Sequence, residues 1–246
     1  MKGTAMDIPD DHPRARSLEI REKLEEGYKS GLVTEMGLIA HGRGEAFDYL
    51  IDEKTIKESV YAIKVASKIL NDSQNPVISV NGNTAALVPK VISDFTNETG
   101  INVEVNLFHR TEDRVRKIIK FLKEHGAGKV LGRNPGKRIP DLSHKRALVT
   151  KEGIYEADTV VVPLEDGDRT EKLIEMGKKV ISIDLNPRSR TAQESSVTIV
   201  DNVVRAMPKL FEFYKEEPDV DIDEFDNEKN LEQIEAKIRR NKFGKD

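Results

Sequence analysis

The chain has 246 residues, of which 34% are charged, with a formal net charge of −4 and no cysteine. The lack of cysteine excludes disulfides, thiolate nucleophiles and cysteine-held metals, and the negative charge predicts that the protein binds neither nucleic acid nor membrane. No apolar run approaches the roughly 18 residues of a membrane-spanning helix, so we expect a cytoplasmic protein.

Short β-branched runs alternate with segments whose apolar residues recur at helical spacing. Helices are predicted from Pro13 to about Lys29 and over about 55–70, 84–98, 111–122, 202–214 and 230–240, with Thr55 and Thr111 as capping residues. Strands are predicted at 77–80, 103–107, 129–131, 159–163, 180–183 and 197–200. This alternation predicts an α/β fold with an open parallel sheet and helices on both faces.

The predicted elements divide the chain into two parts. Residues 6–217 begin with a helical segment, hold every predicted strand, and are expected to form one nucleotide- and substrate-binding catalytic domain. Residues 218–246 are an acidic linker followed by a charged helix, in which Leu231, Ile234 and Ile238 recur at helical spacing. We expect this helix to dock on the domain or on a second subunit.

An unusual polar segment, His41–Glu45, precedes the first predicted strand. Two glycines around Arg43 would let backbone amides approach a ligand, and a guanidinium can hold phosphate or carboxylate through two bonds. We therefore expect a ligand-binding loop in which His41 and Arg43 are candidates for binding and catalysis. The alternative is a glycine-rich turn with a surface arginine.

Other polar residues follow predicted strands, where open parallel sheets bind their ligands. Asn81, Gly82 and Asn83 could bind an anionic substrate at a helix N-terminus, or could form the turn and cap the helix. Asp166 and Asp168 could hold Mg²⁺, or could cap the next helix and complement its dipole.

The segment Asp184–Thr191 is the most informative strand end. Asp184 and Asn186 follow a strand directly and can bond to ribose hydroxyls or a base edge, while Arg190 and the neighbouring hydroxyl groups suit a polyphosphate. Asn202 opens the last helix of the domain, where it could cap the helix or contact a nucleotide.

Several signatures are absent from the sequence. Neither GxGxxG nor GxxxxGK[ST] occurs, which argues against a Rossmann dinucleotide site and a P-loop. Four histidines show neither pairing nor metal-ligand spacing, so we interpret them as surface or structurally satisfied residues: His12, His109, His125 and His144. Spacing alone also makes Arg21 a surface charge.

Taken together and in order, the polar segments resemble the archaeal 4-phosphopantoate–β-alanine ligase family, also called phosphopantothenate synthetase. The resemblance covers about residues 8–210. Its matching segments are Ile8–Pro9, His12–Arg14, Gly37–Leu50, Pro76–Asn83, Arg110–Glu112, Val162–Thr170, Ile183–Pro187, Ser189–Thr191 and Ile199–Arg205.

The resemblance implies a Rossmann-like fold, usually in a homodimer, and a ligase activity. Such an enzyme joins 4-phosphopantoate to β-alanine on the route to coenzyme A, and it converts ATP to AMP and pyrophosphate through an acyl-adenylate. The implied small-molecule partners are ATP, 4-phosphopantoate and β-alanine, with Mg²⁺ accompanying ATP.

The resemblance also implies a set of ATP contacts, which revises the interpretation of Arg21. The residues concerned are Arg21, Arg43, Asp184, Leu185, Asn186, Arg190, Thr191, Asn202 and Val203. Arg188 stands where the family often has an aliphatic residue, so no role is assigned to it. Substrate positioning and charge stabilisation can carry such a reaction without a covalent nucleophile, which leaves His41, Arg43 and Arg190 as catalytic candidates.

Two other classes stay open. The chain could be a different phosphate-substrate α/β enzyme, such as a sugar-phosphate isomerase or a nucleotide transferase. It could also be a regulatory module that binds a nucleotide without catalysis. Arginine- and histidine-bearing segments at several strand ends favour an enzyme over the module.

Overall fold

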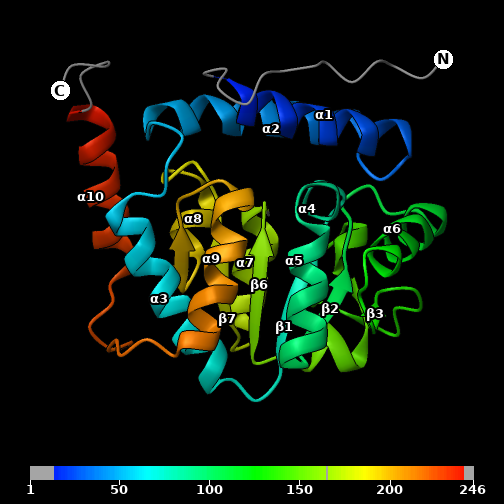
Figure 1. Cartoon of the computed structure of the whole chain (residues 1–246). Coiled ribbons are helices and arrows are strands. Elements are labelled where there is room, and N and C mark those ends of the chain that lie inside the picture. The colour runs from blue at the N-terminus through cyan, green and yellow to red at the C-terminus, as the bar shows by residue number, and fades with distance from the viewer. Residues whose placement is uncertain (1–13, 165, 241–246) are drawn as a thin grey trace.

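The structure is a computed structural model that describes residues 14–164 and 166–240. At its centre lies a sheet of six strands in the order β3-β2-β1-β6-β7-β8, and every neighbouring pair is parallel (Figure 1). These strands are β1 (Pro76–Val80), β2 (Asn102–Val105), β3 (Val130–Leu131), β6 (Thr159–Pro163), β7 (Lys179–Ile183) and β8 (Val197–Ile199). The predicted open parallel sheet is confirmed.

Helices surround this sheet, and a short antiparallel pair, β4 (Lys137–Arg138) and β5 (Leu148–Val149), lies beside it. The α-helices are α1 (Ala15–Lys29), α2 (Glu35–Leu50), α3 (Lys57–Asp72), α4 (Gly82–Leu87), α5 (Pro89–Asp94), α6 (Glu112–Glu124), α7 (Gly167–Glu175), α8 (Arg190–Glu194), α9 (Val203–Glu216) and α10 (Asn227–Arg240). Three short turns of other helix types are η1 (Phe95–Thr99), η2 (Lys145–Ala147) and η3 (Lys151–Tyr155). Among the described helices, none is long and apolar enough to cross a membrane.

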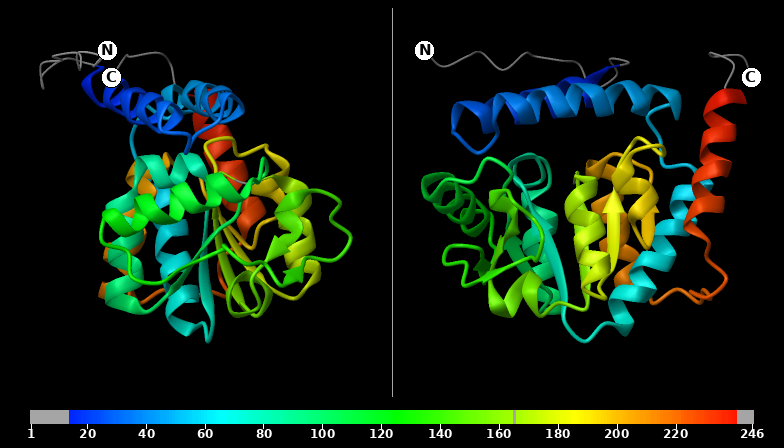
Figure 2. Two further views of the ribbon diagram at one scale, coloured as in Figure 1. Left: turned by 90° about the vertical axis from the view of Figure 1, so that its right-hand side faces the viewer. Right: turned by 180° about the vertical axis from the view of Figure 1, so that it is seen from behind.

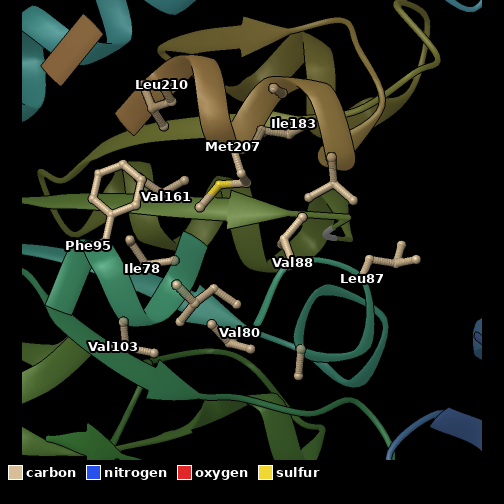
Figure 3. Close-up of a cluster of buried hydrophobic side chains, with 14 of the residues drawn as sticks. Ile78, Val80, Leu87, Val88, Phe95, Val103, Val161, Ile183, Met207 and Leu210 are labelled. Carbon is tan, nitrogen blue, oxygen red and sulfur yellow. The ribbon is translucent and has the colours of Figure 1, made fainter. Parts of the chain in front are cut away.

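The sheet has an apolar core on each face because successive side chains of a strand point to opposite sides. Ile78 and Val80 of β1 pack with residues of α3, α5, α6 and α9, and Figure 3 shows this core around Phe95 and Met207. Val77, which precedes Ile78 and points to the opposite face, packs with α7 and with the segment 139–157. Burial on both faces explains why the strands read as continuous apolar runs.

Two details differ from the predicted helices. The predicted helix at 84–98 is broken into α4, α5 and η1, because Pro89 lacks an amide hydrogen and Val88 before it leaves helical geometry, with φ −134° and ψ 43°. Thr55 does not cap α3, which begins after Ile56; its hydroxyl group donates to Asp201 at 2.6 Å instead.

The strand order reverses between β1 and β6, and ligands of open α/β sheets bind at such a reversal beyond the carboxyl ends of the strands. Helices α1 and α2 form a layer across this end of the sheet, as both views in Figure 2 show. The fold therefore leaves the strand-end loops beneath α1 and α2.

The C-terminal helix α10 belongs to the same compact unit as the sheet. Its buried Leu231 and Ile234 pack in a cluster that includes Leu185 and Ala192, which lie in and just after the loop that follows β7. The amide group of Asn227 donates to the carbonyl oxygen of Ala192 at 2.9 Å and accepts from the Thr198 backbone at 2.8 Å. Of the two predicted docking partners, the domain itself is the one the structure shows.

Candidate functional site

The turn after β1, at Asn81, lies where the strand order reverses. The amide group of Asn81 donates to the carbonyl oxygens of Pro163 and Leu164 at 2.9 and 3.2 Å, and its oxygen caps α4 by accepting from Thr84 at 3.0 Å. A side chain at Gly82 would lie 2.2 Å from the Leu32 carbonyl oxygen, so the close approach of the chain here requires glycine.

Asn83 next to it is buried and donates to the Gly37 carbonyl oxygen at 2.8 Å, which ties α2 to α4. The alternative reading of the segment 81–83 as a capped structural turn is therefore correct for Asn81. Substrate binding by these three residues stays a prediction.

The β7–α8 loop, residues 184–189, is held by its own side chains. The Asp184 carboxylate accepts from the Asn186 backbone amide at 2.9 Å and from the Ser189 hydroxyl group, while Ser189 caps α8. Asn186 in turn accepts from the backbone amide of Arg188 at 2.9 Å. Burial raises the pKa of Asp184. The loop is therefore shaped before any ligand arrives.

The segment His41–Glu45 was predicted as a loop, and this prediction is wrong. These residues form the middle of α2, which Thr34 caps by accepting from Gly37 at 3.2 Å. The helix forms despite its two glycines because the Thr34 cap and the α1–α2 connection fix where it begins. Each glycine lowers the stability of the helix by only about 1 kcal/mol relative to alanine.

Within α2, Gly44 faces the β7–α8 loop, whereas Gly42, two residues earlier, points to a different side of the helix. A side chain at Gly44 would first meet Leu185, at 3.5 Å, and nothing described lies within 4 Å of the same position at Gly42. The positive charge of Arg43 lowers the pKa of Asp184, against the larger effect of burial. Arg43 and Asp184, distant in sequence, therefore lie near enough to interact electrostatically, and their contacts with ATP stay a prediction.

The β8–α9 connection is fixed by a buried network. Asn202 caps α9 by accepting from Val204 at 3.2 Å, and its amide group donates to Asp48 of α2 at 2.9 Å. Arg205 pairs with both Asp48 and Asp201. The backbone of Asn202 is also engaged, since its amide donates to Asp201 at 2.8 Å and its carbonyl oxygen accepts from Arg205 and Ala206 at 2.9 Å each.

A polar cavity of about 290 Å³ lies between α1, α2 and the start of α9. Asn202 and Arg205 line it from one side, and His41, Glu45 and Asp48 line it from α2. Burial lowers the pKa of His41, although Glu45 nearby opposes this shift.

Two arginines of the predicted ATP set lie in exposed ion pairs. Arg21 of α1 donates to Glu45 of α2 at 2.8 Å, and Arg190 pairs with Asp168 and Glu171 of α7. Each guanidinium would have to exchange these partners to bind a phosphate. Surface pairs of this kind are weak enough for such an exchange.

Asp166 takes the alternative capping role, and Mg²⁺ binding by Asp166 or Asp168 stays a prediction. Asp166 caps α7 by accepting from Arg169 at 3.1 Å and pairs with Arg146 at 2.7 Å, whereas Asp168 is exposed and paired with Arg190. Within residues 14–164 and 166–240, no group of three acidic or histidine side chains could hold a metal. Glu165 of the same predicted segment lies outside the described residues.

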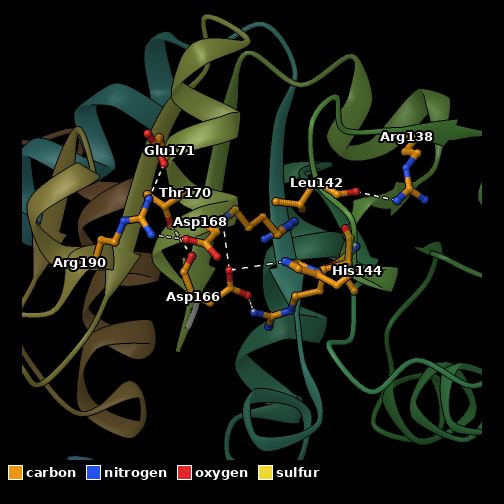
Figure 4. A network of polar contacts seen from close by, with 11 residues as sticks. Arg138, Leu142, His144, Asp166, Asp168, Thr170, Glu171 and Arg190 are labelled. Atoms are coloured by element: carbon orange, nitrogen blue, oxygen red, sulfur yellow. Dashed lines mark hydrogen bonds and ion pairs between the residues drawn. The ribbon is translucent and has the colours of Figure 1, made fainter.

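A second polar group, which the sequence did not predict, lies at the ends of β2 and β6. We call Arg110, His144 and Arg146 the basic cluster. Asn106 donates to the Arg146 carbonyl oxygen at 3.1 Å, which joins the end of β2 to η2. The Asp166 carboxylate lies 2.7 Å from Nη1 of Arg146 and 4.0 Å from Nε2 of His144. Figure 4 shows Asp166 facing His144.

His144 was interpreted as a surface or satisfied residue, and this interpretation is wrong. Its side chain is only 23% exposed, and neither ring nitrogen has a hydrogen-bond partner. Only proximity in space to Asp166 and Phe108 distinguishes it, so no signal in the sequence could have separated it from the other histidines.

A family model and two curated relatives point to the same family of proteins. A family model described as phosphopantothenate/pantothenate synthetase matches residues 58–241. A 4-phosphopantoate–beta-alanine ligase of Thermococcus onnurineus is 51% identical over 240 residues, which are 94% of this chain and 92% of the relative. A protein of the same name from Methanosarcina mazei is 54% identical over 210 residues, or 85% of this chain and 83% of the relative.

Proposed function

Because the chain belongs to the phosphopantothenate/pantothenate synthetase family, we propose that it is an ATP-dependent ligase that joins 4-phosphopantoate to β-alanine. The observation that carries this proposal is 51% identity over 94% of the chain to a relative with that name. The product would be 4′-phosphopantothenate, an intermediate on the route to coenzyme A, made in the cytoplasm.

ATP is proposed to lie between α2 and the loops after β7 and β8. Asp184 and Asn186 would bond to the ribose, as their position directly after a strand favours. Arg43, Arg190 and Thr191 would face the phosphates. Asn202 and Val203 would contact ATP at the start of α9, beside the cavity under α2. Arg21 and Leu185 complete the proposed set.

Magnesium would enter with the phosphates of ATP, while Asp166 is paired with Arg146 and Asp168 with Arg190 before the nucleotide binds. Mg²⁺ commonly keeps several waters and binds substrate phosphates rather than a protein cage. No carboxylate of this chain is therefore assigned to it.

The proposed chemistry has two steps. A carboxylate oxygen of 4-phosphopantoate attacks the α-phosphorus of ATP, and pyrophosphate leaves. The amine of β-alanine then attacks the acyl carbon, AMP leaves, and the nitrogen loses a proton. Negative charge builds on phosphate oxygens in the first step, where the guanidinium groups of Arg43 and Arg190 would stabilise it.

We propose further that the enzyme is a homodimer that pairs through α2. Met36 and Ile39 lie one turn apart on this helix and are 53% and 56% exposed, and Leu50 falls on the same side. Clusters of exposed apolar side chains can mark an interface, and Arg43 falls on the same side between Ile39 and Leu50, so a partner here would lie beside the proposed ATP site. Light scattering should give twice the chain mass, and Ile39→Glu should give a monomer; a monomeric wild type would refute the dimer.

The test of the activity is to supply ATP, Mg²⁺, 4-phosphopantoate and β-alanine, and then omit each in turn while AMP is measured. The proposal predicts AMP and pyrophosphate in equal amounts, and a ligated product that requires all three substrates. ADP as the stoichiometric product would contradict the acyl-adenylate. ATP binding without turnover would favour the regulatory module, and turnover of another phosphate ester without AMP would favour an isomerase or transferase.

A further inference from the structure

We propose that the basic cluster binds the phosphate group of the acid substrate, and that Arg110 selects the phosphorylated acid over the unphosphorylated one. This inference rests on the proposed function, because it assigns the phosphate of 4-phosphopantoate to residues that neither the resemblance nor the relatives connect with it. It places this group apart from His41–Glu45 and Asn81–Asn83, the two segments for which the sequence predicted ligand or anion binding.

Arg110 carries the argument furthest. Its side chain is only 3% exposed, and its Nη2 donates to the Gly132 carbonyl oxygen at 2.7 Å. Its Nε and Nη1 have no hydrogen-bond partner among the residues that the structure describes. Glu112 reaches only Nη2, at 3.4 Å, from a side chain that is mostly exposed. A buried guanidinium with two unused donors is costly, so the arrangement indicates an anionic ligand that completes it.

His144 has the same kind of incomplete environment at the rim of the cluster. Both its ring nitrogens are buried and without a hydrogen-bond partner, although the ring itself is partly exposed beside Phe108, with ring centroids 5.1 Å apart. The residue thus offers one donor in its neutral form and two when it is protonated. A phosphate dianion is an acceptor that can use these donors.

The surrounding backbone shows that the cluster is a built site. Lys145 donates to the Arg110 carbonyl oxygen at 3.2 Å, and Asn106 donates to the carbonyl oxygens of Arg146 and Leu148, each at 3.1 Å. The β2–α6 loop and the segment 144–148 are therefore fixed to one another. Rigid support of this kind is what selective recognition of an ion requires.

The position of the cluster fits the shape of the substrate. The start of α7 lies between the cluster and the proposed ATP site, with Asp166 facing His144 and Asp168 reaching Arg190 (Figure 4). In 4-phosphopantoate the phosphate and the carboxylate lie at opposite ends of a four-carbon chain. With its phosphate in the basic cluster, the acid can point its carboxylate across the start of α7 towards ATP.

The test compares two acids in one variant. Arg110→Gln keeps a shorter polar side chain and removes the charge, and kcat/KM is measured for 4-phosphopantoate and for pantoate at saturating ATP. We expect a loss of about 10- to 100-fold for 4-phosphopantoate and less than about threefold for pantoate. The KM of ATP should change by less than about twofold. Arg133→Gln, an exposed neighbour of Gly132, serves as the control and should change neither value.

His144→Gln provides a second reading in case Arg110→Gln fails to fold. It should also lower selectivity for the phosphorylated acid, while circular dichroism confirms the fold. Equal losses for both acids in a folded variant, or unchanged selectivity in both variants, would overturn the proposal.

Calorimetry of 4-phosphopantoate binding without ATP separates this inference from the proposed function. Binding that weakens in Arg110→Gln would support the site even if no ligation occurred, and binding equal to that of the wild type would contradict it.

Discussion

The β7–α8 loop and the basic cluster both lie at the carboxyl ends of the strands but are built in different ways. In the loop, Asp184 bonds to residues two and five positions further along the chain. In the cluster, Arg110 and Arg146 come from segments 36 positions apart and meet only through the fold, with Asp166 on a third segment. A local site can be read from sequence, whereas a site assembled by topology cannot.

The two regions also differ in how complete they are. Every described polar side chain that shapes the β7–α8 loop already has a partner, and α10 packs behind it. The basic cluster keeps unused donors on Arg110 and His144. We therefore expect the loop to be preorganised by its own bonds and by α10, and the cluster to be completed by its ligand.

The largest effect is expected when the support of the loop is removed. Ile234 is fully buried against Leu185 and its neighbours, so Ile234→Ala should lower the free energy of unfolding by about 2–5 kcal/mol. It should also raise the KM of ATP more than that of 4-phosphopantoate. Urea unfolding and steady-state kinetics measure the two effects.

Ile238→Ala on the same helix is the matched control, because Ile238 is only partly buried and should cost less. Equal rises in both KM values for Ile234→Ala would show that α10 supports the domain in general and has no particular connection with the loop.

The next effect concerns the proposed phosphate contact in the loop. Arg190→Ala should lower kcat/KM for ATP by roughly 100-fold, the scale of one preorganised transition-state donor, and Arg190→Lys should recover only part of this loss. Stability should barely change, because the pairs of Arg190 with Asp168 and Glu171 are exposed.

Arg188→Ala, two positions away, is the control for this variant, since the Arg188 side chain is exposed, pairs with Glu235 and has no assigned role. Near-wild-type kinetics in folded Arg190→Ala would mean that Arg190 is a surface charge.

The smallest effect is a pH dependence at the cavity under α2. Burial lowers the pKa of His41 below its usual 6.5, while Glu45 and Asp48 oppose this and Arg21 adds to it. Since the folded state binds this proton more weakly than the unfolded chain, stability should fall as pH drops below about 6.5, until the pH passes the folded pKa. His41→Gln should remove that part of the slope in unfolding measured from pH 7.5 to pH 5.5. Parallel slopes for variant and wild type would contradict it.

The strands, most helices and the strand-end position of Asp184 were predictable, because periodicity and polar residues directly after a strand are local signals. The helix α2 was not, since its two glycines resemble a loop and its start depends on the Thr34 cap and on the Asn83–Gly37 bond. Arg110 and His144 were missed for a different reason. Their distinction is a missing partner, and that becomes visible only when the neighbours from β3, η2 and β6 are in place.

The central claim is that the two regions serve different ligands, and one crossed measurement tests it. The KM values of ATP and of 4-phosphopantoate are determined for Asp184→Asn and for Arg110→Gln. The account predicts that Asp184→Asn raises the KM of ATP by about tenfold or more and that of 4-phosphopantoate by less than about threefold, with the reverse pattern for Arg110→Gln. Two variants that raise both constants alike would contradict the division of the site into a nucleotide end and a phosphate end.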